Sequence, residues 1–100
     1  MVAVRGEVDL HTAPDLADEL SALIGRGARE IVVDLSASTF IDSTTLGVLL
    51  HALKRLESRR GRLVIVSNDR RILRTFEITG LDRRFRLEDS LADALELAAA

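Results

Sequence analysis

A run of three consecutive β-branched residues, Ile31-Val32-Val33, is the feature that most constrains how this chain can fold. The run has no polar face, so segment 30–35 is predicted to be a strand buried on both sides, as the strands of parallel sheets are. Parallel neighbours need a crossover connection, which is usually a helix, and helix-like segments do alternate with strand-like ones here. We therefore expect one α/β domain over residues 1–100, with a small mixed, mostly parallel sheet and four helices packed on it.

The other strands are predicted from short apolar runs. They are expected at residues 1–4, 62–66 and 85–87, and the first of them is expected at an edge, either parallel or antiparallel to its neighbour. Residues 6–9, Gly-Glu-Val-Asp, are predicted to form a turn.

The helices are predicted from apolar residues at helical spacing and from the capping residues beside them. Their expected starts are, in chain order, Thr12, Ser43, Asp69 and Asp89-Ser90. The first three are expected to end at Gly25 to Gly27, at Gly61 after about residue 58, and at Gly80. The fourth is expected to place Leu91, Ala94, Leu95 and Ala98 on one face.

Composition narrows the possible functions. The net charge of −2, from 14 basic and 16 acidic residues, gives no general attraction to nucleic acid or to anionic lipid. The absence of cysteine rules out a disulfide, a thiolate metal site and a thiol nucleophile. Without a run of about 18 apolar residues or a leader sequence, we expect no membrane insertion and a cytoplasmic location.

Arginine clusters and histidines are the next candidates for a site. The clusters are Arg59-Arg60 with Arg62, Arg70-Arg71 with Arg74, and Arg83-Arg84 with Arg86. Because the net charge is negative and Trp and Tyr are absent, solvated surfaces are favoured over nucleic-acid binding, and docking to an acidic partner is a weaker alternative. His11 and His51 are far apart in the sequence, with no second ligand at metal-binding spacing.

Catalytic motifs are also missing. The sequence contains no G-x-S-x-G elbow, no G-x-x-x-x-G-K-[ST] loop and no G-x-G-x-x-G loop. We therefore expect neither a cofactor nor a metal, and we expect that the protein is not an enzyme.

The most informative segment is residues 40–47, Phe-Ile-Asp-Ser-Thr-Thr-Leu-Gly, which brings a carboxylate and three hydroxyls to a helix start. The first amides of a helix lack intrahelical partners and carry partial positive charge, so an anion is stabilised there. A phosphate on Ser43 would add about −1.5 to −2 charges beside Asp42. The same residues also make an ordinary helix cap, which needs no further function. The residues alone leave both interpretations open.

In its landmarks the chain resembles the anti-sigma factor antagonists, or anti-anti-sigma factors, of the STAS domain family. These landmarks are Gly6-Glu7-Val8-Asp9 with Thr12-Ala13, Val32-Val33-Asp34-Leu35, residues 40–44, Leu46-Gly47-Val48, Phe76, and Thr79-Gly80-Leu81. They extend from residue 4 to about residue 95, and they imply a STAS-like (SpoIIAA-like) α/β fold.

The resemblance implies a partner-switching protein that regulates transcription. It implies that Ser43 is phosphorylated by an anti-sigma factor that is also a serine kinase, and that a phosphatase reverses this. The unphosphorylated form binds that kinase and releases the sigma factor. The partner-binding residues that it implies are Glu7, Asp9, Thr12, Asp42, Ser43, Thr44, Thr45 and Gly47.

Two departures from the family pattern matter. Thr45 stands where the family commonly has a small residue, so we expect its side chain to obstruct a partner's backbone. Thr44 and Thr45 are also possible secondary phosphorylation sites. The family usually opens with an additional strand, and this chain begins at what resembles the second one. Two alternatives follow: the true start lies upstream, or the unpaired edge is covered in a homodimer.

Two other functions remain as alternatives. One is an interaction module without phosphorylation, in a lipid-transporting ABC system or a stress-sensing complex. The other is an enzyme or a ligand-binding domain of unknown chemistry.

Overall fold

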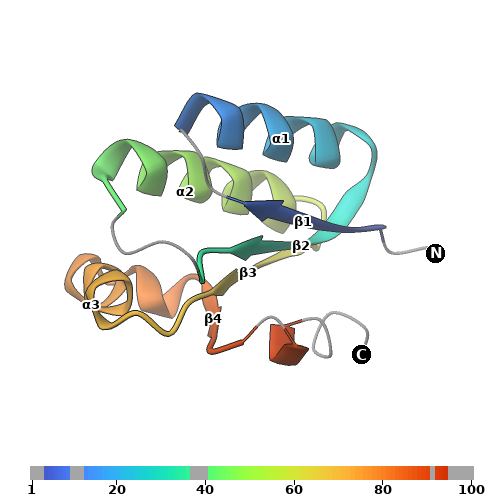
Figure 1. Ribbon diagram of the computed structural model, residues 1–100. Helices are drawn as coiled ribbons and strands as arrows, with labels where there is room; N and C mark the ends of the chain where they lie inside the picture. The colour runs from blue at the N-terminus through green and yellow to red at the C-terminus, as the bar shows by residue number, and fades with distance from the viewer. Residues whose placement is uncertain (1–3, 10–12, 37–40, 91, 95–100) are drawn as a thin grey trace.

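Four parallel strands and the helices that connect them form the framework of the computed structural model (Figure 1). The structure describes residues 4–9, 13–36, 41–90 and 92–94, with the backbone alone for 4–9 and 13. The elements are β1 (Val4–Asp9), α1 (Ala13–Gly25), β2 (Ala28–Asp34), α2 (Ser43–Glu57), β3 (Arg62–Val66), α3 (Arg70–Thr79), a 3-10 turn η1 (Leu81–Arg83) and β4 (Arg86–Glu88).

The sheet has the strand order β1-β2-β3-β4. Every pairing between the described strands is parallel, with Ile31 opposite Leu63 and Val33 opposite Ile65 at its centre. The α/β prediction is confirmed, and the β-branched run lies in β2, between two neighbours. Of the two orientations that the sequence allowed for the first strand, the antiparallel one is wrong, because β1 runs parallel to β2.

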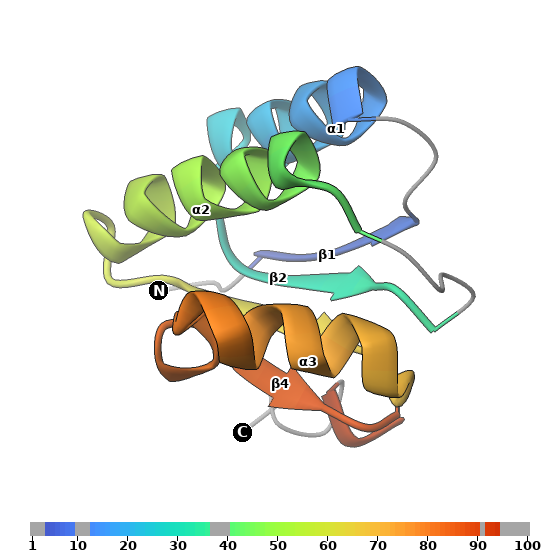
Figure 2. The same cartoon turned by 90° about the vertical axis from the view of Figure 1, so that its left-hand side faces the viewer.

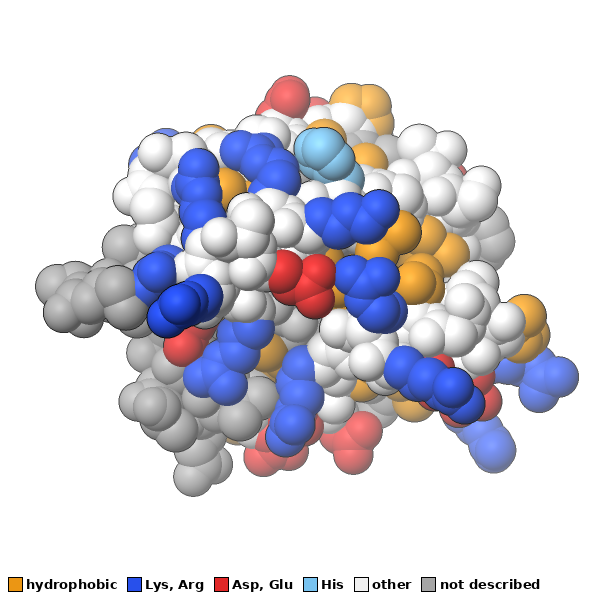
Figure 3. All heavy atoms as spheres, turned by 180° about the vertical axis from the view of Figure 1, so that it is seen from behind, with side chains coloured by type: hydrophobic (Ala, Val, Ile, Leu, Met, Phe, Trp, Pro, Cys, Tyr) orange, Lys and Arg blue, Asp and Glu red, His pale blue; other side chains and the backbone are white. Residues whose placement is uncertain are grey.

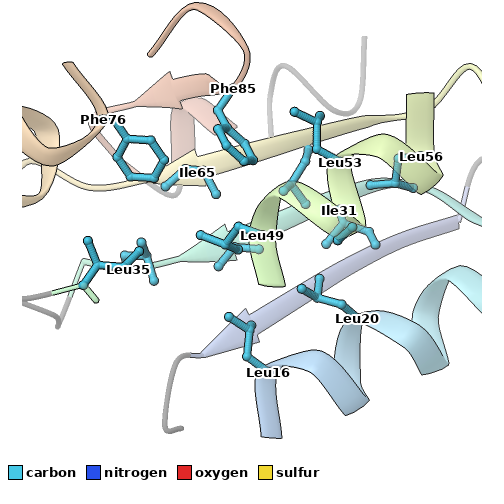
Figure 4. Close-up of a cluster of buried hydrophobic side chains, with 14 of the residues drawn as sticks. Leu16, Leu20, Ile31, Leu35, Leu49, Leu53, Leu56, Ile65, Phe76 and Phe85 are labelled. Atoms are coloured by element: carbon cyan, nitrogen blue, oxygen red, sulfur yellow. The ribbon is translucent and has the colours of Figure 1, made fainter. Parts of the chain in front are cut away.

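The main core lies between the sheet and the helices. Side chains of alternate residues of β2 and β3 pack with α1, α2 and α3 in one cluster, as Figure 4 shows for Ile31, Ile65, Leu20, Leu49 and Phe76. Fully burying a side chain of this size stabilises the fold by about 1.5–3 kcal/mol. Figure 2 shows α1 and α2 lying next to each other over the sheet, in agreement with their mutual contacts.

The opposite face of the sheet has a smaller core. Val32, Val64 and Val66 pack there with Ala94 from the short helical segment at residues 92–94. Ser90 caps that segment, since its Oγ accepts from the Asp93 amide at 3.2 Å, as the sequence predicted. Of the other residues predicted for this helix, Leu91, Leu95 and Ala98 lie outside the described residues.

The predicted turn at residues 6–9 is wrong, because these residues belong to β1. Gly6 pairs with Ile31 and Val8 with Val33, so β1 continues to Asp9 beside the buried strand. Backbone pairing outweighs the turn preference of Gly and Asp here, because local propensity is a weak determinant of strand formation.

The end of α2 agrees with the prediction to within one residue, since the helix runs to Glu57. After it, Arg60 rather than Gly61 takes the left-handed conformation, with a φ of 59°. At Gly61 the constraint is space, because a Cβ there would meet the carbonyl oxygen of Arg29 in β2. Gly27 and Gly80 do have the positive φ expected of glycines that end helices.

Candidate functional site

The start of α2 is fixed by the side chain of Asp42. Its Oδ1 accepts a hydrogen bond from the Thr45 amide at 2.8 Å, and its carbonyl accepts from the Leu46 amide at 3.0 Å. Hydrogen bonds from Thr45, from the backbone amide first and from the side chain second, hold the pKa of the Asp42 carboxyl below its ordinary value of 3.8. The helix therefore begins at Ser43 next to a carboxylate that stays charged.

Ser43 and Thr44 are both exposed in the first turn of α2. Ser43 is the first residue of the helix, so its hydroxyl lies where the backbone amides have no intrahelical acceptor. An enzyme that modifies proteins could therefore reach either hydroxyl from solvent.

The position of Thr45 differs from the expectation that its side chain meets a partner and that its hydroxyl is a secondary phosphorylation site. It is buried, with 5 % of its surface exposed, among residues that share its helix face such as Leu49. Its side chain therefore cannot obstruct a partner, and its hydroxyl cannot reach a kinase, unless the helix start opens. The residue instead supports the cap, through its hydrogen bonds to Asp42.

The more distant residues of the expected surface lie on or after β1. Glu7 and Asp9 belong to this strand, and Asp9 pairs with Asp34 where β1 and β2 end. The C-terminal ends of β1 and β2 lie next to each other, and the chain continues from the end of β2 towards α2. The backbone of Asp9 therefore lies on the same side of the molecule as the start of α2. Thr12 lies outside the described residues.

A groove of about 310 Å³ lies along α1 and α2, and Thr44 is one of the residues that line it. Its lining residues, called the α1–α2 groove below, are Ala17, Leu20, Ser21, Thr44, Gly47, Val48, His51, Ala52 and Arg55. Arg55 Nη1 donates to Ser21 Oγ at 3.1 Å and joins the two helices. On the face shown in Figure 3, a histidine side chain lies among Lys and Arg side chains and near exposed hydrophobic atoms.

Of these lining residues, the sequence interpretation included two, Thr44 and Gly47. Ala17, Ser21, Gly47 and Ala52 are all small, and small residues on the facing sides of two helices were the available signal. That signal identifies a groove only once the two helices are known to be neighbours.

Arginines from all three clusters form ion pairs within the chain. These pairs are Arg62–Glu30 at 3.1 Å, Arg71–Asp69 at 2.8 Å, Arg84–Glu57 at 3.0 Å and Arg86–Glu88 at 3.2 Å. The Arg71 guanidinium holds the pKa of the Asp69 carboxyl below its ordinary value, and Asp69 caps α3. These arginines thus have structural partners, although exposed pairs of this kind stabilise a fold by only about 0–1 kcal/mol each.

In the described part of the chain, no group of three His, Asp or Glu side chains is placed to hold a metal ion. No helix in the same residues has both the length and the apolar character that crossing a membrane requires. His51 lines the α1–α2 groove, and His11 lies outside the described residues.

Comparisons with known proteins agree with this geometry. A family model of the STAS domain matches residues 1–94. The anti-sigma-B factor antagonist of Staphylococcus aureus is 41% identical over 80 residues, which are 80% of this chain and 74% of that protein. The protein of the same name from Listeria monocytogenes is 38% identical over 80 residues, 80% of this chain and 70% of that one.

A solved structure is similar over almost the whole chain. The crystal structure of an anti-sigma factor antagonist from Mycobacterium paratuberculosis superposes with a TM-score of 0.79 and 33% sequence identity. The match covers 98% of this chain and 83% of that one.

Proposed function

The chain belongs to the STAS domain family and, within it, to the anti-sigma factor antagonists, and from this premise we propose that it is a switch controlled by phosphorylation of Ser43. The unphosphorylated protein binds an anti-sigma factor that is also an ATP-dependent serine kinase, and the sigma factor is released. The kinase transfers the γ-phosphoryl group of ATP to Ser43 Oγ, whose proton is lost, and ADP leaves. A phosphatase hydrolyses the ester and restores binding, and all these steps take place in the cytoplasm.

The observation that carries this proposal is the exposure of Ser43 at the start of α2, directly after a charged cap. The hydroxyl is accessible to a kinase, and the buried side chains of the helix are on its other face. A phosphate here would be close to the Asp42 carboxylate, and free helix amides would partly compensate its charge. Phosphorylation would therefore change the surface that a partner meets more than it changes the fold.

The size of the required effect is reasonable for one phosphate. A shift from 99 % bound to 1 % bound needs a difference of about 5.5 kcal/mol in binding free energy. A phosphate enclosed in a protein contact must lose much of its hydration, and burying an unpaired charge costs several kcal/mol. The surface that a partner would contact comprises Glu7, Asp9, Thr12, Asp42, Ser43, Thr44 and Gly47.

The acceptor can be identified by intact-mass measurement after incubation with the purified cognate anti-sigma factor and MgATP. We expect the wild-type chain to gain one phosphoryl group and Ser43→Ala to gain none. Thr44→Ala is the matched variant, because it removes the neighbouring exposed hydroxyl, and it should still gain one phosphoryl group. Because Thr44 lies on the proposed partner surface, the final mass is compared and not the rate of phosphorylation. Undiminished phosphorylation of Ser43→Ala would exclude Ser43 as the acceptor.

A further inference from the structure

Helix α2 contains a glycine, Gly47, where packing within the described chain does not require one. Gly47 is exposed in the second turn of the helix, and a Cβ at this position would meet no atom within 4 Å. Glycine in a helix interior is about 1 kcal/mol less favourable than alanine. Glycine at position 47 therefore lowers the stability of the helix without improving the packing inside the chain. This indicates that the open space beside it accommodates a partner molecule.

This space is the middle of the α1–α2 groove. On α2 the lining residues recur at three- and four-residue spacing, from Thr44 through Gly47 and His51 to Arg55, so they form one continuous face of the helix. This face is about 16 Å long at 1.5 Å per residue. Ala17, Leu20 and Ser21 of α1 form the opposite wall. A groove of this length between two helices is suited to a third helix that buries its apolar side there.

The charge of the groove indicates what kind of helix fits. The ionisable side chains that line it are His51 and Arg55, and both are basic residue types. Arg55 is half-buried and uses one donor on Ser21 Oγ, but a guanidinium carries five N–H donors. An occupant with a carboxylate near this end of the groove would pair with the remaining donors in a charge-assisted contact.

The groove is also continuous with the proposed phosphorylation site. Thr44 lines its beginning, and Thr44 directly follows Ser43. We propose that the α1–α2 groove receives an amphipathic helix of the anti-sigma factor, with its apolar side over Gly47 and an acidic side chain on Arg55. This inference rests on the proposed function, because it specifies how the same partner is held.

Substitutions in the groove test the inference, with the affinity for the purified cognate anti-sigma factor measured by isothermal titration calorimetry. Gly47→Leu places a large side chain at the groove, and its Cβ would meet no atom of the chain within 4 Å, so we expect binding to weaken at least about tenfold. Gly47→Ala should bind more tightly than Gly47→Leu and should unfold at a higher temperature than the wild type, because alanine favours the helix. This comparison separates loss of docking from loss of folding.

The charge is tested with a matched pair of reversals. Arg55→Glu should weaken binding at least about tenfold, whereas Lys54→Glu should stay within about twofold of the wild type. Lys54 is exposed on the same helix and carries the same charge, but it does not line the groove. Thermal unfolding of both variants checks that they remain folded.

Each outcome has one meaning. Gly47→Leu could bind the anti-sigma factor with wild-type affinity while phosphorylation of Ser43 still abolishes that binding. This result would overturn the groove inference and leave the proposed function intact. No binding by the unmodified wild type would overturn the proposed function, and the groove inference with it. Self-association that Gly47→Leu abolishes, with partner binding unchanged, would assign the groove to a second copy of the chain and overturn the inference.

Discussion

At the start of α2, a single carboxylate affects both the stability of the helix and the charge around Ser43. The Thr45 amide lies 2.8 Å from Asp42 Oδ1, and this bond lowers the pKa of the carboxyl. Asp42 therefore caps the helix as an anion, next to the hydroxyl that we propose is phosphorylated. A phosphate added there meets a charge that is already present at neutral pH.

We expect Asp42→Ala to lower the free energy of unfolding, because the Thr45 amide loses its acceptor. Asp42→Asn is the control that keeps an acceptor but removes the charge. Because the folded-state pKa lies below 3.8, the carboxylate's contribution is present above that pH and is lost as the pH falls through the folded-state value. Urea unfolding should therefore show the advantage of the wild type over Asp42→Asn shrinking in acid. An advantage that does not depend on pH would contradict this account of the cap.

At the scale of the element, α2 shows which of its properties follow from its sequence. The leucines at helical spacing and Asp42 predicted its start and its buried face. The burial of Thr45 could also have been predicted, because Thr45 precedes Leu49 by four residues on the same stripe. The end of α2 at about residue 58 was also predicted. The residue that takes positive φ after it, Arg60 rather than Gly61, could not be predicted, because this depends on how closely β2 approaches.

This explanation of the helix end predicts opposite effects at neighbouring positions. Gly61→Ala should destabilise the fold by about 1–3 kcal/mol, because its methyl group would meet the backbone of β2 at Arg29. Arg60→Gly should be neutral or stabilising, because glycine adopts positive φ without the Cβ penalty. Both are measured by urea unfolding. The explanation is wrong if Gly61→Ala is as stable as the wild type.

At the scale of the whole molecule, the features that depend on distant residues were the ones that the sequence did not reveal. The buried run at Ile31 to Val33 predicted the α/β class, since a strand without a polar face needs cover on both sides. Residues 6–9 were wrongly predicted to be a turn, because their pairing with β2 makes them part of the sheet. The α1–α2 groove was missed because its walls are separated by more than 20 residues of sequence.

The central claim is that one phosphate on Ser43 turns a binding surface into a non-binding one. The most direct test is the affinity of the purified anti-sigma factor for the unmodified chain and for the Ser43-phosphorylated chain, measured by calorimetry under identical conditions. We predict that phosphorylation weakens binding about 10⁴-fold, and that phosphatase treatment of the same sample restores it. Equal affinity of the two forms would contradict the claim.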